Sequence, residues 1–171
     1  SSAFSYTLEQ SAINGNCIPF KNSTISFIRA PCPAAPAVLL RDVRGLKRGH
    51  QFDKVELVKF CQPENSWDEL TTLLEEALEV VRLLGLRYRV QRIAAGDTGF
   101  GGAMQYDIDV WAPGSREWLE VSSCSNFLDF QARRANLRYR DTEGRVQHLH
   151  TLNGSALALP RTLAALIEQY E

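Results

Sequence analysis

A short turn between two strand-like segments limits the folds open to this chain more than any other feature. In residues 105–111, aromatic and β-branched side chains alternate with carboxylates, as in a strand with one buried face. Pro113-Gly114-Ser115 then turns the chain, and residues 117–122 follow at once. So short a connection joins antiparallel strands, because parallel strands need a much longer crossover. The hairpin therefore predicts an antiparallel sheet.

Further strands are expected on either side of this hairpin. They are segments bounded by turn residues, and they cover 51–60, 86–95, 130–140 and 145–151. Asp141-Thr142-Glu143-Gly144 supplies the turn between the last two. Residues 25–36 differ, because Pro31, Pro33 and Pro36 cannot donate to a sheet ladder. This argues against a central strand there.

Two helices complete the predicted fold. The clearer one covers residues 66–84, where apolar residues recur at helical spacing. Ser66 and Glu69 fit a capping box at its start, and Gly85 is placed to end it. A second helix begins near Pro160. Its buried face is expected to consist of Leu163, Leu166, Ile167 and Tyr170. The elements together predict an α+β fold, an antiparallel β-sheet flanked by helices.

Composition and motifs exclude several classes of protein. The net charge of −1 creates no general attraction to nucleic acid or membrane, and no apolar run reaches transmembrane length. The four cysteines are scattered, which favours reduced thiols in the cytoplasm over disulfides or a zinc site. His148 and His150 lack further ligands for a metal. The glycine-rich residues 96–103 match neither a P-loop nor a dinucleotide-binding fingerprint.

The stretch from Trp118 to Arg138 carries the most chemistry. Glu120 stands alone in an apolar run, and small polar residues follow it: Ser122, Ser123, Cys124 and Ser125. Three arginines close the stretch: Arg133, Arg134 and Arg138. A carboxylate can hold a divalent cation, and guanidinium groups prefer anionic or planar partners. The pattern favours a polyphosphate–metal ligand, and a hydroxyl-rich hairpin with a solvated cationic edge is the alternative.

Two charged residues elsewhere occupy unusual places. Glu56 would share a strand face with Phe52, which is uncommon for a surface carboxylate. The alternative is an edge-strand carboxylate paired with Lys54 or Lys59. Arg161 would lie at a helix N-terminus, where the helix dipole disfavours a cation. This cost indicates that Arg161 meets an anion.

Three long strings resemble class II aminoacyl-tRNA synthetases in their seryl form. They are RDVRGLKRGHQFDKVELVKF, WLEVSSCSNFLDFQARRANLRYR and HTLNGSALALPRTLAALIEQY, and the resemblance covers roughly residues 41–171. It implies a serine–tRNA ligase core that uses ATP and Mg²⁺ to form seryl-adenylate and then loads tRNA(Ser). It also implies a cytoplasmic, non-membrane protein that is a homodimer at full length.

The same resemblance implies a role for individual residues. ATP would be bound by Arg48, Gly49, Phe52, Glu120, Val121, Ser122, Ser123 and Arg161. Glu120 and Ser123 would also hold Mg²⁺ on the ATP phosphates. Serine would be bound by Thr7, Glu9, Glu56, Asn153 and Ser155. Adenylate formation needs positioning and charge neutralisation, so no residue is expected to act as a catalytic acid or base.

The sequence departs from the family in its first quarter. The family's Arg-x-Glu strand should lie near residues 29–36, but the matching positions hold Pro33 and Ala35, or Ala34 and Pro36. Arg29 fits only in a shifted register. Residues 10–40 thus look degenerate within a partial catalytic domain spanning 1–171, and the family's first motif and its N-terminal tRNA-binding coiled coil have no counterpart.

Three functions therefore stay open for a chain with this pattern. The first is a serine–tRNA ligase core with impaired activity, because the missing arginine would stabilise the transition state. The second is a non-catalytic paralogue that acts as a binding or scaffold protein. The third is an aminoacyl ligase that loads a carrier protein. Whether the change near residues 29–36 is a reading-frame error or a real loss also stays open.

Overall fold

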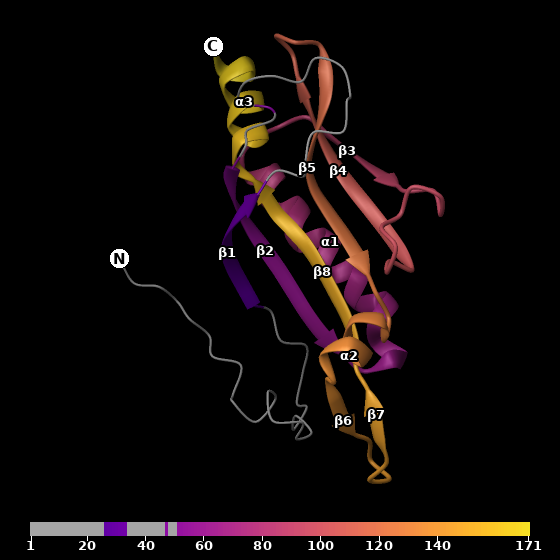
Figure 1. Cartoon of the computed structure of the whole chain (residues 1–171). Coiled ribbons are helices and arrows are strands. Elements are labelled where there is room, and N and C mark those ends of the chain that lie inside the picture. Colours follow the sequence, from indigo (N-terminus) through magenta and orange to yellow (C-terminus); the bar gives the residue numbers. More distant parts are fainter. Residues whose placement is uncertain (1–25, 34–46, 48–50) are drawn as a thin grey trace.

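The fold is described by a computed structural model, which covers residues 26–33, 47 and 51–171 (Figure 1). The predicted site residues Thr7, Glu9, Arg48 and Gly49 lie outside these described residues, as do positions 34–36. No helix among the described residues is long and apolar enough to cross a membrane.

The centre of the molecule is a six-stranded sheet in the order β1-β2-β8-β5-β4-β3. Its strands are β1 (Ser26–Pro33), β2 (Gln51–Cys61), β3 (Tyr88–Arg92), β4 (Met104–Ala112), β5 (Glu117–Asn126) and β8 (His150–Ala158). Every neighbouring pair is antiparallel. The predicted α+β class and the hairpin around Pro113-Gly114-Ser115 are confirmed, and the strand expected over residues 51–60 is β2.

β1 forms a strand in spite of its prolines. In the described sheet it pairs with β2 alone, with Pro31 opposite Asp53 and Pro33 opposite Gln51. An edge strand tolerates proline because one of its sides makes no ladder. The expectation that this segment is not a central strand is therefore confirmed.

α1 (Ser66–Leu83) lies behind the sheet in Figure 1, after a short 3-10 turn, η3 (Pro63–Asn65). The predicted capping box is wrong, because Asn65 occupies the N-cap. The Ser66 hydroxyl instead donates to the Pro63 carbonyl oxygen (3.1 Å), and Glu69 turns to a lysine of β2. The predicted end is confirmed, since Gly85 adopts a left-handed φ of 65° just beyond the helix.

The strand predicted over residues 130–140 is wrong in its first half. Phe130–Ala135 forms a short helix, α2, which ends at Asn136 in a left-handed conformation (φ 55°). Only Arg138–Arg140 is extended, as β6, and it pairs with β7 (Val146–His148). Glutamine, alanine and arginine are good helix formers, and this preference prevails over the strand-like pattern. The serine-rich segment that follows residue 122 extends β5 to Asn126, beyond the strand predicted over residues 117–122.

α3 (Leu159–Tyr170) has a different buried face from the predicted one. Thr162, Ala164 and Ala165 are buried, whereas Leu163, Ile167 and Tyr170 are 50%, 46% and 68% exposed. Leu166 alone of the predicted set packs on the core. Small residues let the helix approach the sheet closely. Its rotation is fixed by polar contacts from Arg161 and Glu168, at its two ends, to the β4–β5 hairpin.

Both long helices share one hydrophobic core with a single face of the sheet. Leu73 and Val81 of α1, Ala165 of α3 and Val110 of β4 are fully buried in it. Strand residues of the opposite parity, such as Glu56 and Ser123, are polar and face away from this core. The polar side is called the open face below, and it carries the candidate site.

Lys59 is a charged residue on the core side of β2. Its side chain is 1% exposed, and its ammonium contacts Glu69 at 3.2 Å and Glu76 at 3.1 Å, both on α1. These two residues are seven apart, so they lie on the same side of the helix. The ion cluster thus fixes the position of α1 along β2.

His148 and His150 belong to different strands, because β7 ends at the first and β8 begins at the second. His148 Nδ1 lies 3.2 Å from the Leu137 carbonyl oxygen, and His150 Nδ1 lies 2.9 Å from the Ser66 hydroxyl. No group of three or more metal-ligating side chains occurs in the part of the chain that the structure describes.

The stability of the folded chain is expected to fall at mildly acidic pH because of His150. Burial lowers the pKa of His150, while Asp129 and Glu64 partly oppose this shift. The unfolded chain therefore takes up a proton more readily, so stability is fully present above about pH 6.5 and declines as the pH falls below it. Urea denaturation across this range should show the decline in the native protein and in His148→Gln, and a weaker one in His150→Gln. An unchanged slope in His150→Gln would contradict the assignment.

A second stability prediction concerns Gly154, where β8 meets β5. A Cβ at this position would lie 2.8 Å from Cys124 Sγ, 3.1 Å from Cys124 Cα and 3.1 Å from the Ser123 carbonyl oxygen. Two of these neighbours are backbone atoms that cannot turn away. Gly154→Ala should therefore lower the free energy of unfolding by about 1–3 kcal/mol. Gly99→Ala is the control, because nothing lies within 4 Å of its added Cβ; equal effects of the two changes in urea denaturation would refute the prediction.

Candidate active site

The positions of Glu120 and Ser123 in the candidate site depend on a shift in the pairing register between β4 and β5. Ile108 pairs with Ser122, but the next residue, Asp109, pairs with Glu120, so Val121 is an extra residue in β5. Such a bulge changes the alternation of side chains. Glu120 and Ser123 therefore face the same side of the sheet, although they are three residues apart.

A second irregularity brings two predicted serine-binding residues together. Val55 pairs with Leu157, whereas Glu56 pairs with Ser155, so Ala156 is extra in β8. The Ser155 hydroxyl donates to Glu56 Oε2 at 3.3 Å. Both residues lie on the open face, and their predicted role in binding serine stays a prediction.

Lys54 joins this pair. Its ammonium lies 2.6 Å from Glu56 Oε2 and 3.5 Å from the Ser155 hydroxyl. The alternative prediction that Glu56 pairs with Lys54 is thus observed, but β2 is an interior strand and not an edge strand. Lys59, the other suggested partner, lies on the core side. The three open-face groups form one small polar cluster.

Asn153 is held from the side by α2. Its amide nitrogen donates to Gln131 Oε1 at 3.2 Å, and the Thr151 hydroxyl donates to the same oxygen at 2.8 Å. This arrangement aligns Asn153 with Ser155, two residues further along β8. Sequence reasoning missed Gln131, because the segment around it was predicted to be a strand.

Arg161 lies at the opposite end of the candidate site. Its Nη1 donates to the Glu120 carbonyl oxygen at 2.9 Å and lies 3.8 Å from the Glu120 carboxylate, while its Nε donates to the Lys47 carbonyl oxygen at 3.2 Å. The anion that it meets in the structure is the Glu120 carboxylate, and the predicted contact with the ATP phosphates stays a prediction. These acceptors offset its unfavourable place at the start of α3.

The Glu120 carboxylate remains accessible, with its side chain 51% exposed. Loss of hydration raises the pKa of Glu120, and Asp107 and Asp109 raise it further, whereas Arg161 lowers it. Asp109 is itself engaged by Arg89 at 2.8 Å. Glu120 is thus a carboxylate under repulsion from its neighbours, and an added cation would relieve that repulsion.

The remaining predicted ATP residues differ in where they point. Val121 is buried in the core, and Ser122 is 2% exposed with its hydroxyl donating to the Ser155 carbonyl oxygen. Their side chains therefore do not share the open face with Ser123. Phe52 is half-buried on β2, opposite Cys32 of β1.

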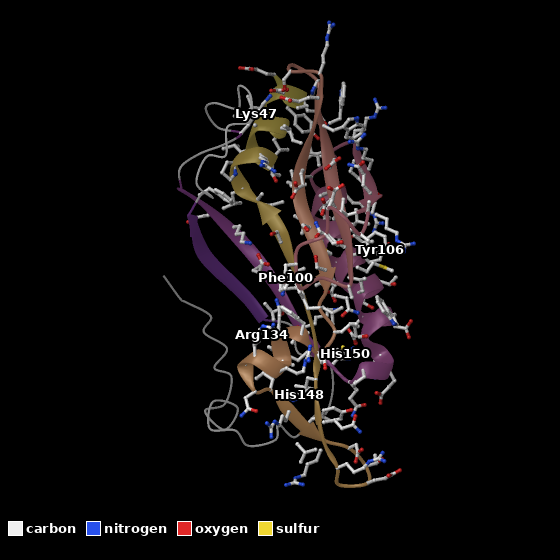
Figure 2. All side chains as sticks on the ribbon, turned by 45° about the vertical axis from the view of Figure 1, so that its right-hand side comes forward. Lys47, Phe100, Tyr106, Arg134, His148 and His150 are labelled. Atoms are coloured by element: carbon white, nitrogen blue, oxygen red, sulfur yellow. The ribbon has the colours of Figure 1, made fainter. Side chains whose placement is uncertain are left out.

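Lys47 is a positioning contact that sequence reasoning missed. Its ammonium bonds to Glu117 and lies 3.6 Å from Glu168. The contact fixes residue 47 against the β4–β5 hairpin and α3, directly before the predicted ATP residue Arg48. Figure 2 shows Lys47 at the α3 end of the sheet and Arg134 towards the α2 end.

Two of the three arginines that close the stretch from Trp118 to Arg138 make local contacts. Arg133 pairs with Asp129 at 3.2 Å, and Arg134 lies over the Phe130 ring at 3.5 Å from its centroid. The site thus contains two polar clusters. One consists of Lys54, Glu56 and Ser155 on β2 and β8. The other, the carboxylate–guanidinium cluster, consists of Glu120 on β5 and Arg161 on α3.

Comparison with known proteins identifies the family of this chain. The family model described as the tRNA synthetase class II core domain, for G, H, P, S and T, matches residues 37–170. The chain belongs to this class II synthetase family. The antiparallel sheet with its flanking helices is the class II core, and the clusters lie on its open face.

The relatives that match this chain include serine–tRNA ligases. The chain is 62% identical over 132 residues to a serine–tRNA ligase from Thermomicrobium roseum, which is 77% of this chain and 30% of that protein. It is 52% identical over 161 residues to the serine–tRNA ligase of Clostridium novyi, or 93% of this chain and 37% of that protein. This class II core thus spans about a third of the length of the curated relatives it matches.

A solved structure agrees with these sequences. The crystal structure of seryl-tRNA synthetase from Pyrococcus horikoshii complexed with ATP superposes on 87% of this chain and 34% of that chain, with a TM-score of 0.82 and 38% identity. The identity is high enough to compare sites as well as folds.

Proposed function

We propose that this class II core is the catalytic part of a serine–tRNA ligase, which activates serine with ATP and transfers the seryl group to tRNA(Ser). The observation that carries the proposal is the cluster of Glu56, Ser155 and Lys54 on the open face. It offers a carboxylate and a hydroxyl to a small polar amino acid. The serine–tRNA ligases among its relatives support the same substrate.

Serine would enter this cluster by exchange of partners. Its ammonium group can replace the ammonium of Lys54 at the Glu56 carboxylate, and its hydroxyl can bond to Ser155 or to the free amide oxygen of Asn153. A site that bonds to the substrate hydroxyl rejects alanine, because its own polar groups would be left without partners. Thr7 and Glu9 are proposed to close over the amino acid.

Magnesium and ATP would occupy the other end. Glu120 and Ser123 present a carboxylate and a hydroxyl on one side of the sheet, which are the hard oxygen ligands that Mg²⁺ prefers. The repulsion among Glu120, Asp107 and Asp109 fits a cation there. The metal would neutralise phosphate charge. Arg161 and Arg48 would orient the phosphates while the serine carboxylate attacks the α-phosphorus and pyrophosphate leaves.

The whole-protein properties are also proposals. A homodimer in the cytoplasm that binds tRNA(Ser) follows from the family, and the remaining length of the relatives would supply the further contacts. A non-catalytic paralogue is the second candidate, favoured by the absence of Arg-x-Glu near residues 29–36, where the family places it. The carrier-protein ligase stays a third possibility.

Titration calorimetry and pyrophosphate exchange test these candidates together. We expect Mg·ATP and serine to bind, serine to bind more weakly to Glu56→Gln, and alanine to compete poorly. Exchange of labelled pyrophosphate into ATP with serine supports the ligase, whereas binding without exchange supports the paralogue. Exchange followed by seryl transfer to a carrier protein, and not to tRNA, supports the third. No binding of either ligand, even after Pro33→Arg and Ala35→Glu restore Arg-x-Glu, overturns both ligase candidates.

A further inference from the structure

Phe100 is an apolar side chain in an unusual position. It belongs to the glycine-rich loop between β3 and β4, and it is 96% exposed, more than any other large apolar residue in the described ranges. A phenylalanine that buries almost nothing contributes little to folding. Its position therefore points to a partner outside this chain.

The surroundings of Phe100 are built from planar groups. Its ring meets the Phe130 ring edge to face, with the centroids 5.7 Å apart and an angle of 78° between the planes. The Arg134 guanidinium lies 3.5 Å from the Phe130 centroid and donates to the Phe130 carbonyl oxygen. Two rings and a guanidinium thus form one contiguous row.

The loop is fitted to this row through its glycines. A Cβ on Gly101 would lie 2.6 Å from the Phe130 ring, so the loop backbone rests directly against Phe130. The close approach holds the neighbouring Phe100 outward.

This row of side chains lies next to the residues proposed to bind serine. Phe130 is followed in α2 by Gln131, whose amide oxygen accepts hydrogen bonds from Asn153 and Thr151. α2 therefore connects the row to a proposed serine-binding residue. Arg161 and Glu120, proposed to bind ATP, belong instead to α3 and to the first half of β5. Figure 2 shows Phe100 and Arg134 displaced from Lys47 towards the α2 end.

Aromatic rings and guanidinium planes stack on nucleobases, and arginine also attracts phosphate. The exposed Arg134 and Arg138 supply local positive charge in a chain whose net charge is −1. An RNA whose unpaired end must reach activated serine fits both properties. We propose that Phe100, Phe130 and Arg134 form a stacking platform for the single-stranded 3′ end of tRNA. This inference rests on the proposed function and adds the place where the acceptor end enters.

The test compares two hairpin RNAs with the same acceptor-stem duplex, one with the single-stranded 3′ end of tRNA and one blunt. Fluorescence anisotropy at low salt measures their binding to the chain. Loss of one stacked base corresponds to roughly 5- to 150-fold weaker binding. We expect Phe100→Ala to weaken binding of the overhang RNA by that factor and to leave the blunt RNA unchanged. Phe100→Tyr should retain the affinity, and Arg134→Lys should lose part of it.

Leu83→Ala is the matched control, because Leu83 is an apolar side chain 79% exposed on α1. It should leave binding of both RNAs unchanged. The platform is overturned if neither RNA binds, if Phe100→Ala weakens both RNAs equally, or if it weakens neither. Mg·ATP and serine are separate ligands, so overhang-dependent RNA binding without any binding of them would reject the activation function and not the platform.

Discussion

Lys59→Ala is expected to lower the free energy of unfolding by about 3 kcal/mol. Lys59 is 1% exposed, and its ammonium is the common partner of Glu69 and Glu76. Removing one member of a buried ion cluster costs about 3–5 kcal/mol, because the remaining charges stay desolvated and repel each other. The two carboxylates keep 21% and 32% exposure, so water screens part of this cost. Urea denaturation measures the loss.

Two further variants show whether the loss comes from the uncompensated carboxylates. Lys59→Met fills the space without the charge, and adding Glu76→Gln to it should recover part of the stability. Arg82→Ala is the control for an ordinary ion pair, because Arg82 and Glu75 are 41% and 54% exposed. It should cost no more than about 1 kcal/mol. If Lys59→Ala costs no more than Arg82→Ala, the cluster does not anchor α1.

Arg161→Gln is expected to weaken binding of Mg·ATP by about 10- to 150-fold. Hydrogen bonds to charged groups contribute about 1.5–3 kcal/mol, and a guanidinium offers two parallel bonds to phosphate. The same substitution removes donors to the Lys47 and Glu120 carbonyl oxygens. Lys47 and the predicted ATP residue Glu120 would thus lose a shared hydrogen-bond donor. Titration calorimetry with Mg·ATP measures the change.

Arg161→Lys should recover only part of the affinity, because an ammonium cannot make the forked contact. Arg133→Gln is the matched control, since Arg133 is an exposed arginine paired with Asp129 outside the carboxylate–guanidinium cluster. It should leave ATP binding unchanged. Equal effects of the two glutamine variants would indicate a general electrostatic effect and would count against a specific phosphate contact.

Local patterns were sufficient for much of the fold. β2 and the hairpin of β4 and β5 follow from alternation of period two, and Gly85 ends α1 as its conformational freedom predicts. Errors occurred where a pattern has two interpretations. The six residues of α2 are too few to show a helical period, and polar contacts at both ends of α3 set its rotation.

The candidate site was less accessible to sequence reasoning. The resemblance named Glu120, Ser123, Glu56 and Ser155, but no local pattern predicts the extra residues Val121 and Ala156. A bulge depends on the partner strand, which a single segment does not reveal. Gln131 and Lys47 were missed for a related reason, because their roles come from contacts between elements distant in sequence.

The two extra residues divide the site into parts that can vary separately. One bulge lies in β5, against β4, and sets the direction of Glu120 and Ser123, the groups proposed to face the nucleotide. The other lies in β8, against β2, and brings Ser155 beside Glu56, the groups proposed to face the amino acid. A change of register at one seam leaves the other pairing intact. Under the proposed function, such a sheet could change its amino-acid preference while keeping the groups proposed to hold ATP.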